Sequence, residues 1–500
     1  MMVLSVVYFF FVGLFLVAFS YKRVRGIYRF MKRVMKIEGP SYWELATVHA
    51  KELLGDDTIG HICKLCVQYG YRPWGFFSSN LEFIVVVSDP DTIADVFKNP
   101  NTSDKSSFMY GGLKDYVPNG SLVTNGPQWK WHRKTISPAF RKYNMDARLD
   151  ILGEGAEELV GQFREKADGP SFDISHILDI STADTTLKFI TNNIQVVPSV
   201  PRFCEAVEEG MNLAQSQTLN PFYHWYKMRF DKRTREKEKL AREVIKETGS
   251  LFREAKITAK NRMSNRLDPQ PADVMECLAS AAPEPGITEQ DLVDEVITMA
   301  VGGMETTRNS MKTLMFLLAL YPDVQQRLYE EQETIMGQRD RPTPQDIQDM
   351  KYMDAVIKEA LRLYPSIPLI GRAVNKTSTI GGVTVPKGAC VIINVMAMQR
   401  NPVLFHDPEK FLPERFIGEV QDKRHPYSYI PFGAGQRTCV GYAQGTITMK
   451  IMMGAVLRNF KIIPAENVKS MDDFKIKMSI TITIREPKVK LISRHKNVAV

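Results

Sequence analysis

One cysteine near the end of the chain stands in a glycine-rich segment, PFGAGQRTCVG, at residues 431–441. Gly435 and Gly441 flank Cys439, and Arg437 lies two positions before it. Glycine lets a flat group approach the backbone closely, and the freed N–H groups can then point at the sulfur. Such donors, together with a nearby arginine, favour the thiolate over the thiol. The segment therefore predicts a cysteine thiolate at a place where a flat chemical group lies against the backbone.

Cysteine thiolate is one of the few protein ligands of haem iron, and it pushes electron density toward O–O cleavage. We therefore expect the glycines to make room for a porphyrin whose iron binds Cys439. Five residues, Phe432, Gly435, Arg437, Cys439 and Gly441, match the pattern F-x-x-G-x-R-x-C-x-G. In this pattern the chain resembles the cytochrome P450 family of haem-thiolate monooxygenases.

A second motif, WKWHR, contains Trp129 and Arg133 in the spacing W-x-x-x-R. The resemblance implies that both side chains reach a haem propionate, as Arg437 and Arg372 are also expected to do. Arginine suits a carboxylate because its guanidinium can bind in two places. His132, between the two motif residues, is not required by the motif, and we expect an ordinary surface or core histidine.

A third motif, VGGMETT, lies at 301–307. Adjacent glycines each cost a helix about 1 kcal/mol relative to alanine, which favours a functional reason for them. The resemblance implies that Gly303 lets the helix distort over the haem, and that Glu305 and Thr306 are the catalytic acid–alcohol pair that delivers protons to dioxygen. The chain most resembles the microsomal subgroup of this family that includes fatty-acid ω-hydroxylases. Many members of that subgroup attach haem through a glutamate ester where this chain has Gly302. We therefore expect non-covalent haem b (iron protoporphyrin IX).

A fourth motif, KEALR, places Glu359 and Arg362 on one helix face, since they are three residues apart. The resemblance implies that they form a buried structural ion network with Arg415 of the later PERF segment. One departure from the family pattern is Gln399, which replaces a histidine thought to touch a propionate.

The periodicity of the chain predicts a fold that is mainly α with small β-sheets, as in the cytochrome P450 fold. Long helices that end before a proline, and short strands with alternating or continuous apolar residues, carry this prediction. We expect helices at 291–320 and 345–364, a solvated charged helix face at 227–247, strands within 380–395 and 478–486, and a proline-rich loop at 268–286.

The first twenty residues carry no charge, and a basic stretch follows them. This length and order predict a transmembrane signal anchor at 1–21, a basic linker at 22–40 and a haem domain at 41–500. A cleaved signal peptide is the alternative, although no cleavage site is evident. The positive-inside rule places the haem domain on the cytosolic side, and the resemblance implies the endoplasmic reticulum membrane. The hinge after the anchor is reduced to Glu38-Gly39-Pro40.

The bulk composition excludes some classes of protein. A net charge of +8 over 500 residues, with no basic-aromatic stripe, argues against nucleic-acid binding. Six irregularly spaced cysteines argue against a disulfide framework and favour a reducing compartment. Cys63 and Cys66, just after His61, supply too few ligands for a closed zinc site, so we favour two small residues on one helix face.

The segment NGSLVTNGPQWKWHRKTISPAF at 119–140 and the order of the motifs look most like the microsomal subgroup that includes fatty-acid ω-hydroxylases. The resemblance implies electrons from NADPH through a cytochrome P450 reductase, with cytochrome b5 as a second donor. Two other functions stay open: a haem-thiolate isomerase or dehydratase acting on peroxides without dioxygen, and a membrane-tethered haem sensor. Thr306 argues against the former, since such relatives usually lose this alcohol.

The substrate is expected to be lipophilic, because the segments that the resemblance places around it are largely apolar. These segments are 107–118, 213–222, 297–307, 366–372 and 479–483. Six basic residues form either a positive face for an acidic redox partner or merely a set of solvated charges. They are Lys130, Lys134, Arg141, Lys142, Lys423 and Arg424.

Overall fold

The computed structural model describes most of the chain after residue 57. The residues described are 30, 32, 34–41, 44, 57–78, 82–219, 221–266, 273–282, 284–418, 424–473, 475–478 and 480–494, with no side chains given for 218–223. Within these ranges no helix is both long and apolar enough to cross a bilayer. The anchor expected at 1–21 lies outside the described residues and stays a prediction.

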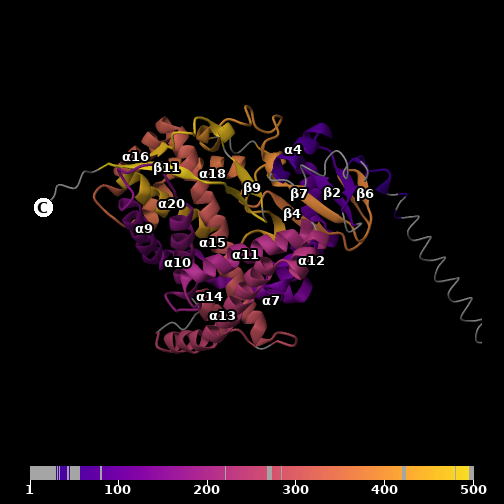
Figure 1. Ribbon diagram of the computed structural model, residues 1–500, viewed down its shortest axis with the longest axis horizontal. Helices are drawn as coiled ribbons and strands as arrows, with labels where there is room; N and C mark the ends of the chain where they lie inside the picture. Colours follow the sequence, from indigo (N-terminus) through magenta and orange to yellow (C-terminus); the bar gives the residue numbers. More distant parts are fainter. Residues whose placement is uncertain are drawn as a thin grey trace, which may run out of the picture.

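Helices make up most of the fold, which confirms the expected mainly α class (Figure 1). They are α4 (Thr58–Gln68), α5 (Pro90–Lys98), α6 (Ser107–Tyr110), α7 (Gly126–Ile136), α8 (Lys142–Asp146), α9 (Leu149–Arg164), α10 (Ser175–Thr191), α11 (Val200–Leu219), α12 (Pro221–Phe230), α13 (Lys232–Ser264), α14 (Val274–Ala279), α15 (Glu289–Leu320), α16 (Pro322–Met336), α17 (Pro344–Asp349), α18 (Lys351–Leu363), α19 (Val395–Gln399) and α20 (Tyr442–Asn459).

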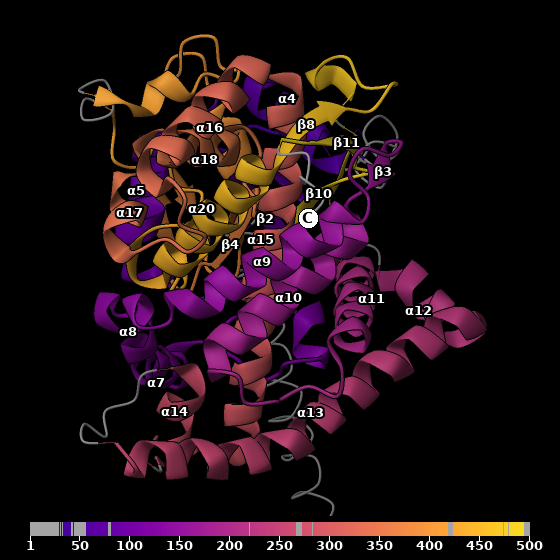
Figure 2. The same cartoon turned by 90° about the vertical axis from the view of Figure 1, so that its left-hand side faces the viewer.

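The longest buried helix, α15, organises the others. It begins with a capping box, in which Thr288 and Asp291 satisfy each other's backbone N–H groups, and it ends where Pro322 cannot continue it. Its 32 residues span about 48 Å, enough to cross the whole domain. The helix packs between α10 and α20, and Figure 2 shows it passing through the centre of the molecule. The prediction for 291–320 is confirmed.

The strands form small sheets: β1 (Trp74–Phe77), β2 (Phe83–Val87), β3 (Phe172–Asp173), β4 (Leu369–Ala373), β5 (Ser378–Ile380), β6 (Val383–Val385), β7 (Cys390–Asn394), β8 (Phe460–Pro464), β9 (Ile476–Met478), β10 (Ile482–Ile484) and β11 (Lys488–Ser493). The largest has the order β1-β2-β7-β4, and only β2 and β7 run parallel. Gly381 and Gly382, both with positive φ, close the hairpin of β5 and β6. Strands β6 and β7 fall within the range 380–395 where strands were expected.

Two element predictions need correction. The helix expected at 345–364 is two helices, because Met350 leaves the helical region with ψ 68° and separates α17 from α18. The loop expected at 268–286 contains α14, whose six residues are all buried. Proline density signalled a break in the chain there, but the apolar residues between the prolines pack into the core. In the segment 478–486, Met478 ends β9, and Ile482–Ile484 form β10, which pairs with β9.

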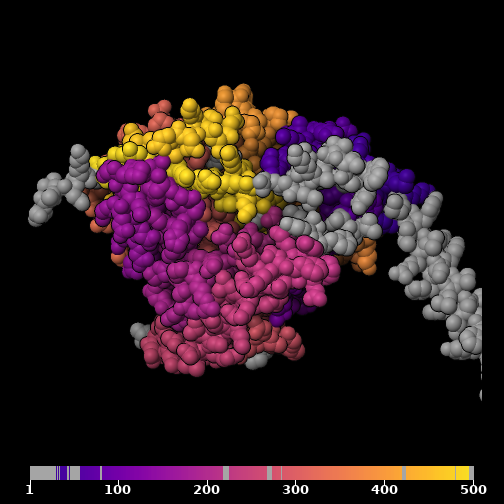
Figure 3. Space-filling view, in the orientation of Figure 1, coloured from indigo at the N-terminus to yellow at the C-terminus, as the bar shows by residue number. Residues whose placement is uncertain are grey.

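The charged stretch at 227–247 spans two helices. Asp231 caps α13, accepting from the N–H of Arg233, and so separates α13 from α12. Most charged side chains of this stretch are exposed, as its mixed charges predicted. Figure 3 shows the magenta segment that includes α11 and α12 at the surface of the face turned to the viewer.

The Cys63–Cys66 pair has a structural explanation. Both sulfur atoms lie near the side-chain amide of Asn394, at 3.7 and 3.5 Å from its Nδ2. Among the described residues no group of three or more His, Cys, Asp or Glu side chains is placed to hold a metal ion. Burial raises the pKa of Cys63 to about 12. This geometry favours a thiol pair packed between α4 and β7.

Candidate active site

The cysteine loop leads directly into α20. Gly433 and Gly435 have φ of +70° and +69°, a conformation that other residues adopt only with strain. The backbone N–H of Cys439 donates to the carbonyl of Phe432 at 2.9 Å, which closes the loop. Gly441 is the N-cap of α20, so the sulfur lies near the positive end of that helix.

The Cys439 thiol faces a cavity inside the protein, between the cysteine loop and α15. Burial raises the pKa of this thiol, while a backbone hydrogen bond from Gly441 and the positive charges of Arg133 and Lys105 lower it. The N–H group predicted to point at the sulfur is therefore present. These donors favour the thiolate wherever a cation is available to bind it.

The cavity has a volume of about 300 Å³ and is lined mainly by apolar side chains. Gly302 opens onto it, because a Cβ placed there would meet no atom within 4 Å. The motif residues Trp129, Arg133, Gly303, Glu305, Thr306, Arg372, Phe432, Arg437, Cys439 and Gly441 all line this one cavity. The structure therefore brings together residues that lie more than 300 positions apart in the chain.

Cationic side chains gather on one side of the cavity. Arg437 donates to the carbonyl of Thr124 at 3.0 Å and lies over the ring of Trp129, 3.9 Å from its centroid. Arg133 donates to the carbonyl of Thr438 at 2.9 Å. Arg372 is buried, and the nearest carboxylate to Arg437, that of Asp104, is 3.8 Å away. These cations line one cavity, and among them only Arg437 has a carboxylate within 4 Å in the described part of the chain.

Burial inside the protein changes the pKa values of these cations. Burial lowers the pKa of Arg437 to about 10, with a further contribution from Arg372. Burial also lowers the pKa values of Arg133 and Arg372. The Nε of Arg437 is buried and has no hydrogen-bond partner among the described residues. A bound dianion would supply the missing partners.

Lys105 is a member of this set that sequence reasoning missed. It lines the cavity, and burial together with Arg372 and Arg437 lowers its pKa well below the usual range. Its Nζ lies 4.1 Å from the centroid of the Tyr110 ring. No motif marks this lysine, and its position in a polar segment gave no sign that it is buried.

Thr306 faces the cavity from α15. Its hydroxyl donates to the carbonyl of Gly302 at 2.8 Å, so its lone pairs remain available to accept a hydrogen bond from the cavity. The Thr306 carbonyl accepts hydrogen bonds from Ser310 and Ser366, which fix the backbone at this turn. The residue is therefore placed to hold a water molecule or a substrate hydroxyl.

Glu305 is fixed by its own partners. Its carboxylate lies 2.7 Å from Arg308 and accepts hydrogen bonds from Thr481 at 2.8 Å and Asn309 at 3.2 Å. Arg308 contacts Asp179 of α10 at 3.2 Å. No hydrogen bond joins Glu305 to the hydroxyl of Thr306 in the described structure. The expected acid–alcohol pair is adjacent in sequence, but the acid belongs to an ion network that leads toward α10.

Gly303 has a packing role that the sequence did not predict. Helix α15 runs from Glu289 to Leu320 without a break, and the distortion expected at this glycine stays a prediction. A Cβ at Gly303 would lie 2.5 Å from Cγ2 of Thr186, so the glycine permits close packing of α10 against α15. The glycine that opens space in the cavity is its neighbour, Gly302.

The predicted ion network is present behind the cysteine loop. Arg362 donates to Glu359 through two nitrogens, at 2.7 and 2.8 Å, and Arg415 donates to Glu359 at 3.2 Å. Gln399 belongs to the same buried region: it donates to the carbonyl of Arg362 and accepts from the N–H of Ile430. Gln399 does not line the cavity.

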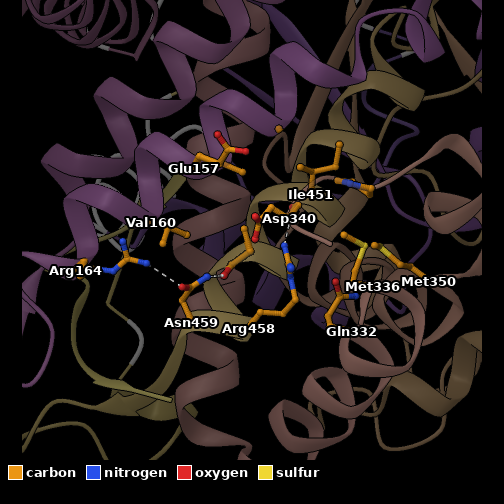
Figure 4. Close-up of a pocket in the computed structure, with 14 residues that line it drawn as sticks. Glu157, Val160, Arg164, Gln332, Met336, Asp340, Met350, Ile451, Arg458 and Asn459 are labelled. Atoms are coloured by element: carbon orange, nitrogen blue, oxygen red, sulfur yellow. Dashed lines mark hydrogen bonds between the residues drawn. The ribbon is translucent and has the colours of Figure 1, made fainter. Parts of the chain in front are cut away.

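A second cavity of about 170 Å³ lies at the far end of α20 (Figure 4). Apolar residues of α9, α16 and α20, such as Val160, Met336 and Ile451, line it together with Gln332 and Arg458. No cysteine and no motif residue line this cavity. It is therefore not the site that the sequence predicts.

The residues of the large cavity fit haem: a thiolate donor faces an apolar space that four cationic side chains also line, and the Nε of Arg437 has no hydrogen-bond partner among the described residues. The family model described as Cytochrome P450 matches residues 54–491, and the chain belongs to this family. The protein is thus a haem-thiolate monooxygenase, an oxidoreductase whose cofactor is haem b. Recognition of the family from its motifs is confirmed.

Similar proteins cover most of the chain. It is 27% identical over 431 residues to "Probable cytochrome P450 4ac3" of Drosophila melanogaster, covering 85% of this chain and 83% of that protein. It is 28% identical over 403 residues to "Cytochrome P450 4V2" of Mus musculus, with 75% and 74% covered. The solved structure "Crystal structure of cytochrome P450DA heme domain" has the same fold, with a TM-score of 0.74 at 20% identity, covering 89% of this chain and 95% of that one.

Proposed function

We propose that this monooxygenase inserts one oxygen atom of dioxygen into a lipophilic substrate, using electrons that NADPH supplies through a cytochrome P450 reductase. The observation that carries the proposal is the large cavity, in which Cys439 and Thr306 line an otherwise apolar space. Haem bound by Cys439 supplies dioxygen activation, because a thiolate ligand favours O–O cleavage. Cytochrome b5 is a second electron donor in this proposal.

The apolar walls support a lipophilic substrate. Four of the five segments expected to line the pocket do so. One lining residue from each is, in chain order, Met109, Met299, Ile367 and Ile480. The fifth, 213–222, contributes no described side chain, and α11 reaches the cavity through Met211 instead. Apolar surfaces of this kind bind aliphatic or aromatic groups by removing them from water.

The side chains that line the cavity have three different roles. Lys105, Arg133, Arg372 and Arg437 would hold the cofactor's carboxylates. Thr306 orients a water molecule or a substrate hydroxyl through its free lone pairs, since its proton is used on the helix. The apolar walls exclude bulk water, which limits the protons that reach the reacting oxygen to those that fixed groups deliver.

The expected docking face for a reductase gains partial support. Lys130, Lys134, Arg141 and Lys142 are exposed on α7 and α8 or between them, on the elements next to the cysteine loop. Arg424 is excluded from this face, because it donates to the carbonyl of Arg415 and stacks on the Phe416 ring. Lys423 lies outside the described residues. Exposed cations of one sign attract an acidic partner at a distance.

Membrane attachment is the remaining part of the proposal: the anchor at 1–21 holds the protein on the cytosolic face of the endoplasmic reticulum. Exposed aromatic side chains of α12 support a second contact with the membrane. Trp225, Tyr226 and Phe230 are 64%, 56% and 62% exposed, with Lys227 and Arg229 among them. Aromatic residues beside basic ones are typical of helices that lie at a lipid surface.

Turnover of a lipid library under ¹⁸O₂, with reductase and NADPH, tests the proposal. We expect a product that carries one ¹⁸O atom and forms only when reductase and NADPH are both present. A product formed from a lipid hydroperoxide without reductase would favour the isomerase or dehydratase reading. A protein that binds haem but shows neither activity would favour a haem sensor.

A further inference from the structure

His132 and Glu295 form a fully buried pair between α7 and α15. The Nδ1 of His132 lies 3.0 Å from Oε2 of Glu295, and neither side chain is exposed. The contact is close but not aligned as a hydrogen bond, and the second nitrogen and second oxygen of the pair have no hydrogen-bond partner among the described residues. Burying two such groups is costly unless each is compensated. The haem motifs do not account for either residue.

The carboxylates of α15 hold one segment of backbone, residues 119–125, which we call the bridge segment. The N–H of Ser121 donates to Glu295 at 2.7 Å, and the N–H of Asn119 donates to Asp294 at 2.9 Å. Gly120, between them, lies directly against α15: a Cβ there would be 1.9 Å from the hydroxyl of Thr298. The bridge segment is thus fixed to the helix at three successive residues.

The other end of the bridge segment reaches the cations of the cavity. The carbonyl of Thr124 and the side-chain oxygen of Asn125 accept hydrogen bonds from Arg437 at 3.0 and 2.8 Å. The same Asn125 oxygen accepts from the N–H of Lys105 at 2.8 Å, and its amide nitrogen donates to the Lys105 carbonyl at 3.1 Å. One short segment therefore connects the buried acids of α15 with two of the cofactor's expected ligands.

The middle of the bridge segment is also a wall of the large cavity, because Ser121 and Leu122 line it. A displacement of this segment would change the shape of the wall and the position of Arg437 together. His132 has no cavity contact of its own. It contacts Glu295, which accepts the hydrogen bond from Ser121 of the cavity wall.

We propose that His132 and Glu295 are positioning residues, which hold the bridge segment against α15 and thereby set the cavity wall at Leu122 and the hydrogen bonds of Arg437. His132 orients the Glu295 carboxylate, and Glu295 orients the Ser121 backbone. This inference rests on the proposed function, because it assumes that a lipophilic ligand contacts the cavity wall at Leu122.

Two azoles that bind haem iron test the proposal in the full-length haem-loaded protein. Imidazole is small and reports mainly on the haem, whereas 1-dodecylimidazole must also lie against the cavity wall. Spectral titration gives a dissociation constant for each without turnover. We expect His132→Leu and Glu295→Leu to weaken 1-dodecylimidazole by about tenfold or more, a loss of at least about 1.4 kcal/mol. Imidazole should be weakened by less than about threefold.

The pair should also act as one unit. The double variant should weaken 1-dodecylimidazole no more than Glu295→Leu alone, because both residues act through Ser121. Glu295→Gln keeps an oxygen that can accept from Ser121 and should restore most of the affinity. If both single variants weaken the two azoles by the same factor, so that the ratio of the two dissociation constants is unchanged, the proposal is overturned.

A second variant covers the case in which the buried pair cannot be changed without loss of haem. Gly120→Ala leaves the pair intact but pushes the bridge segment away from Thr298, and it should weaken the long azole selectively. The control is Gln325→Ala, which removes an equally buried side chain with three hydrogen bonds to backbone groups of Leu318 and Ile462, away from the cavity.

Haem lost from variants of the pair and of Gly120, but kept by Gln325→Ala, supports the proposal, since Arg437 depends on the bridge segment. A Gly120→Ala protein that binds both azoles like the wild type contradicts it. If the wild type itself shows no azole spectrum, the proposed function fails rather than this inference.

Discussion

At the scale of single residues, Thr306 is the group whose geometry speaks most directly to mechanism. Its proton is used on the Gly302 carbonyl, so it offers only lone pairs to the cavity. A water molecule held there would donate to Thr306 and keep its second proton for the reacting oxygen. The residue thus acts by orienting a proton donor, and the buried network around Glu305 is a separate feature on the same helix.

Thr306→Ala should leave haem content and the thiolate spectrum intact while uncoupling NADPH oxidation from product formation. Loss of proton delivery typically costs about 10²–10⁴-fold, so we expect product per NADPH to fall by about tenfold or more, with hydrogen peroxide accounting for the difference. Thr306→Val keeps the volume and should behave like alanine. A valine variant that couples like the wild type would show that Thr306 only shapes the pocket.

Gly302 makes a second prediction at this scale, that haem is not attached covalently. The space beside this glycine is open, and no carboxylate stands there to form an ester. Acidified organic solvent should therefore extract free haem from the purified protein. Gly302→Ala should behave identically, because its Cβ would meet nothing within 4 Å. Haem that stays with the polypeptide on a denaturing column contradicts the prediction.

At the scale of elements, the network of Glu359, Arg362 and Arg415 joins α18 to the segment that leads to the cysteine loop. Arg362 also donates to the carbonyls of Gln399 and Pro408, so that one guanidinium ties three parts of the chain together. All of these contacts are buried or nearly so. The network therefore supports the position of Cys439 without contacting the cavity.

Glu359→Gln should lower the free energy of unfolding by about 3–5 kcal/mol, because it leaves two buried arginines without a counter-charge. Denaturant unfolding measures this loss, and haem content should fall with it. The matched control is Glu236→Gln on α13, whose pair with Lys232 is exposed and 3.6 Å long. Its loss should cost less than about 1 kcal/mol. Equal losses in the two variants would contradict a special role for the buried network.

The elements also show why part of this site was predictable and part was not. Cys439, Trp129, Arg133 and Thr306 stand in spaced motifs, so their types and order were enough to expect one shared cavity. Lys105 is different: its role depends on burial among other cations, and sequence does not reveal burial of a lone lysine.

His132 shows the same limit from another direction. It was expected to be an ordinary histidine, because its partner, Glu295, lies more than 160 positions later in the chain. Likewise, the break at Met350 depends on one backbone angle, while the apolar pattern continues across it. Periodicity predicts which face of a segment is buried, but a single non-helical residue does not disturb it.

At the scale of the whole molecule, the proposed anchor and the α12 surface make a joint prediction about membrane binding. Deletion of residues 1–21 should weaken association with lipid vesicles and leave the haem site intact, since the described residues that line the cavity begin at Lys105. Basic residues after the anchor should preserve some binding, at about 1 kcal/mol each near an anionic surface. Flotation with vesicles of stated anionic content measures both effects.

A further change separates the two contacts. Adding Trp225→Ala, Tyr226→Ala and Phe230→Ala to the deletion should remove the binding that survives a high-salt wash, because that part is apolar. The control is Ile257→Ala, which removes another exposed apolar side chain, on α13. If the triple change has no more effect than the control, α12 is not a membrane contact.

The central claim is that Cys439 binds haem iron as a thiolate, and the spectrum of the reduced protein under carbon monoxide tests it most directly. The wild type should show the thiolate-shifted Soret band. Cys439→Ser should lose both this band and activity, because a neutral hydroxyl is a poor iron ligand. A thiolate-shifted band that persists in Cys439→Ser, or one that is absent from the haem-loaded wild type, would contradict the account.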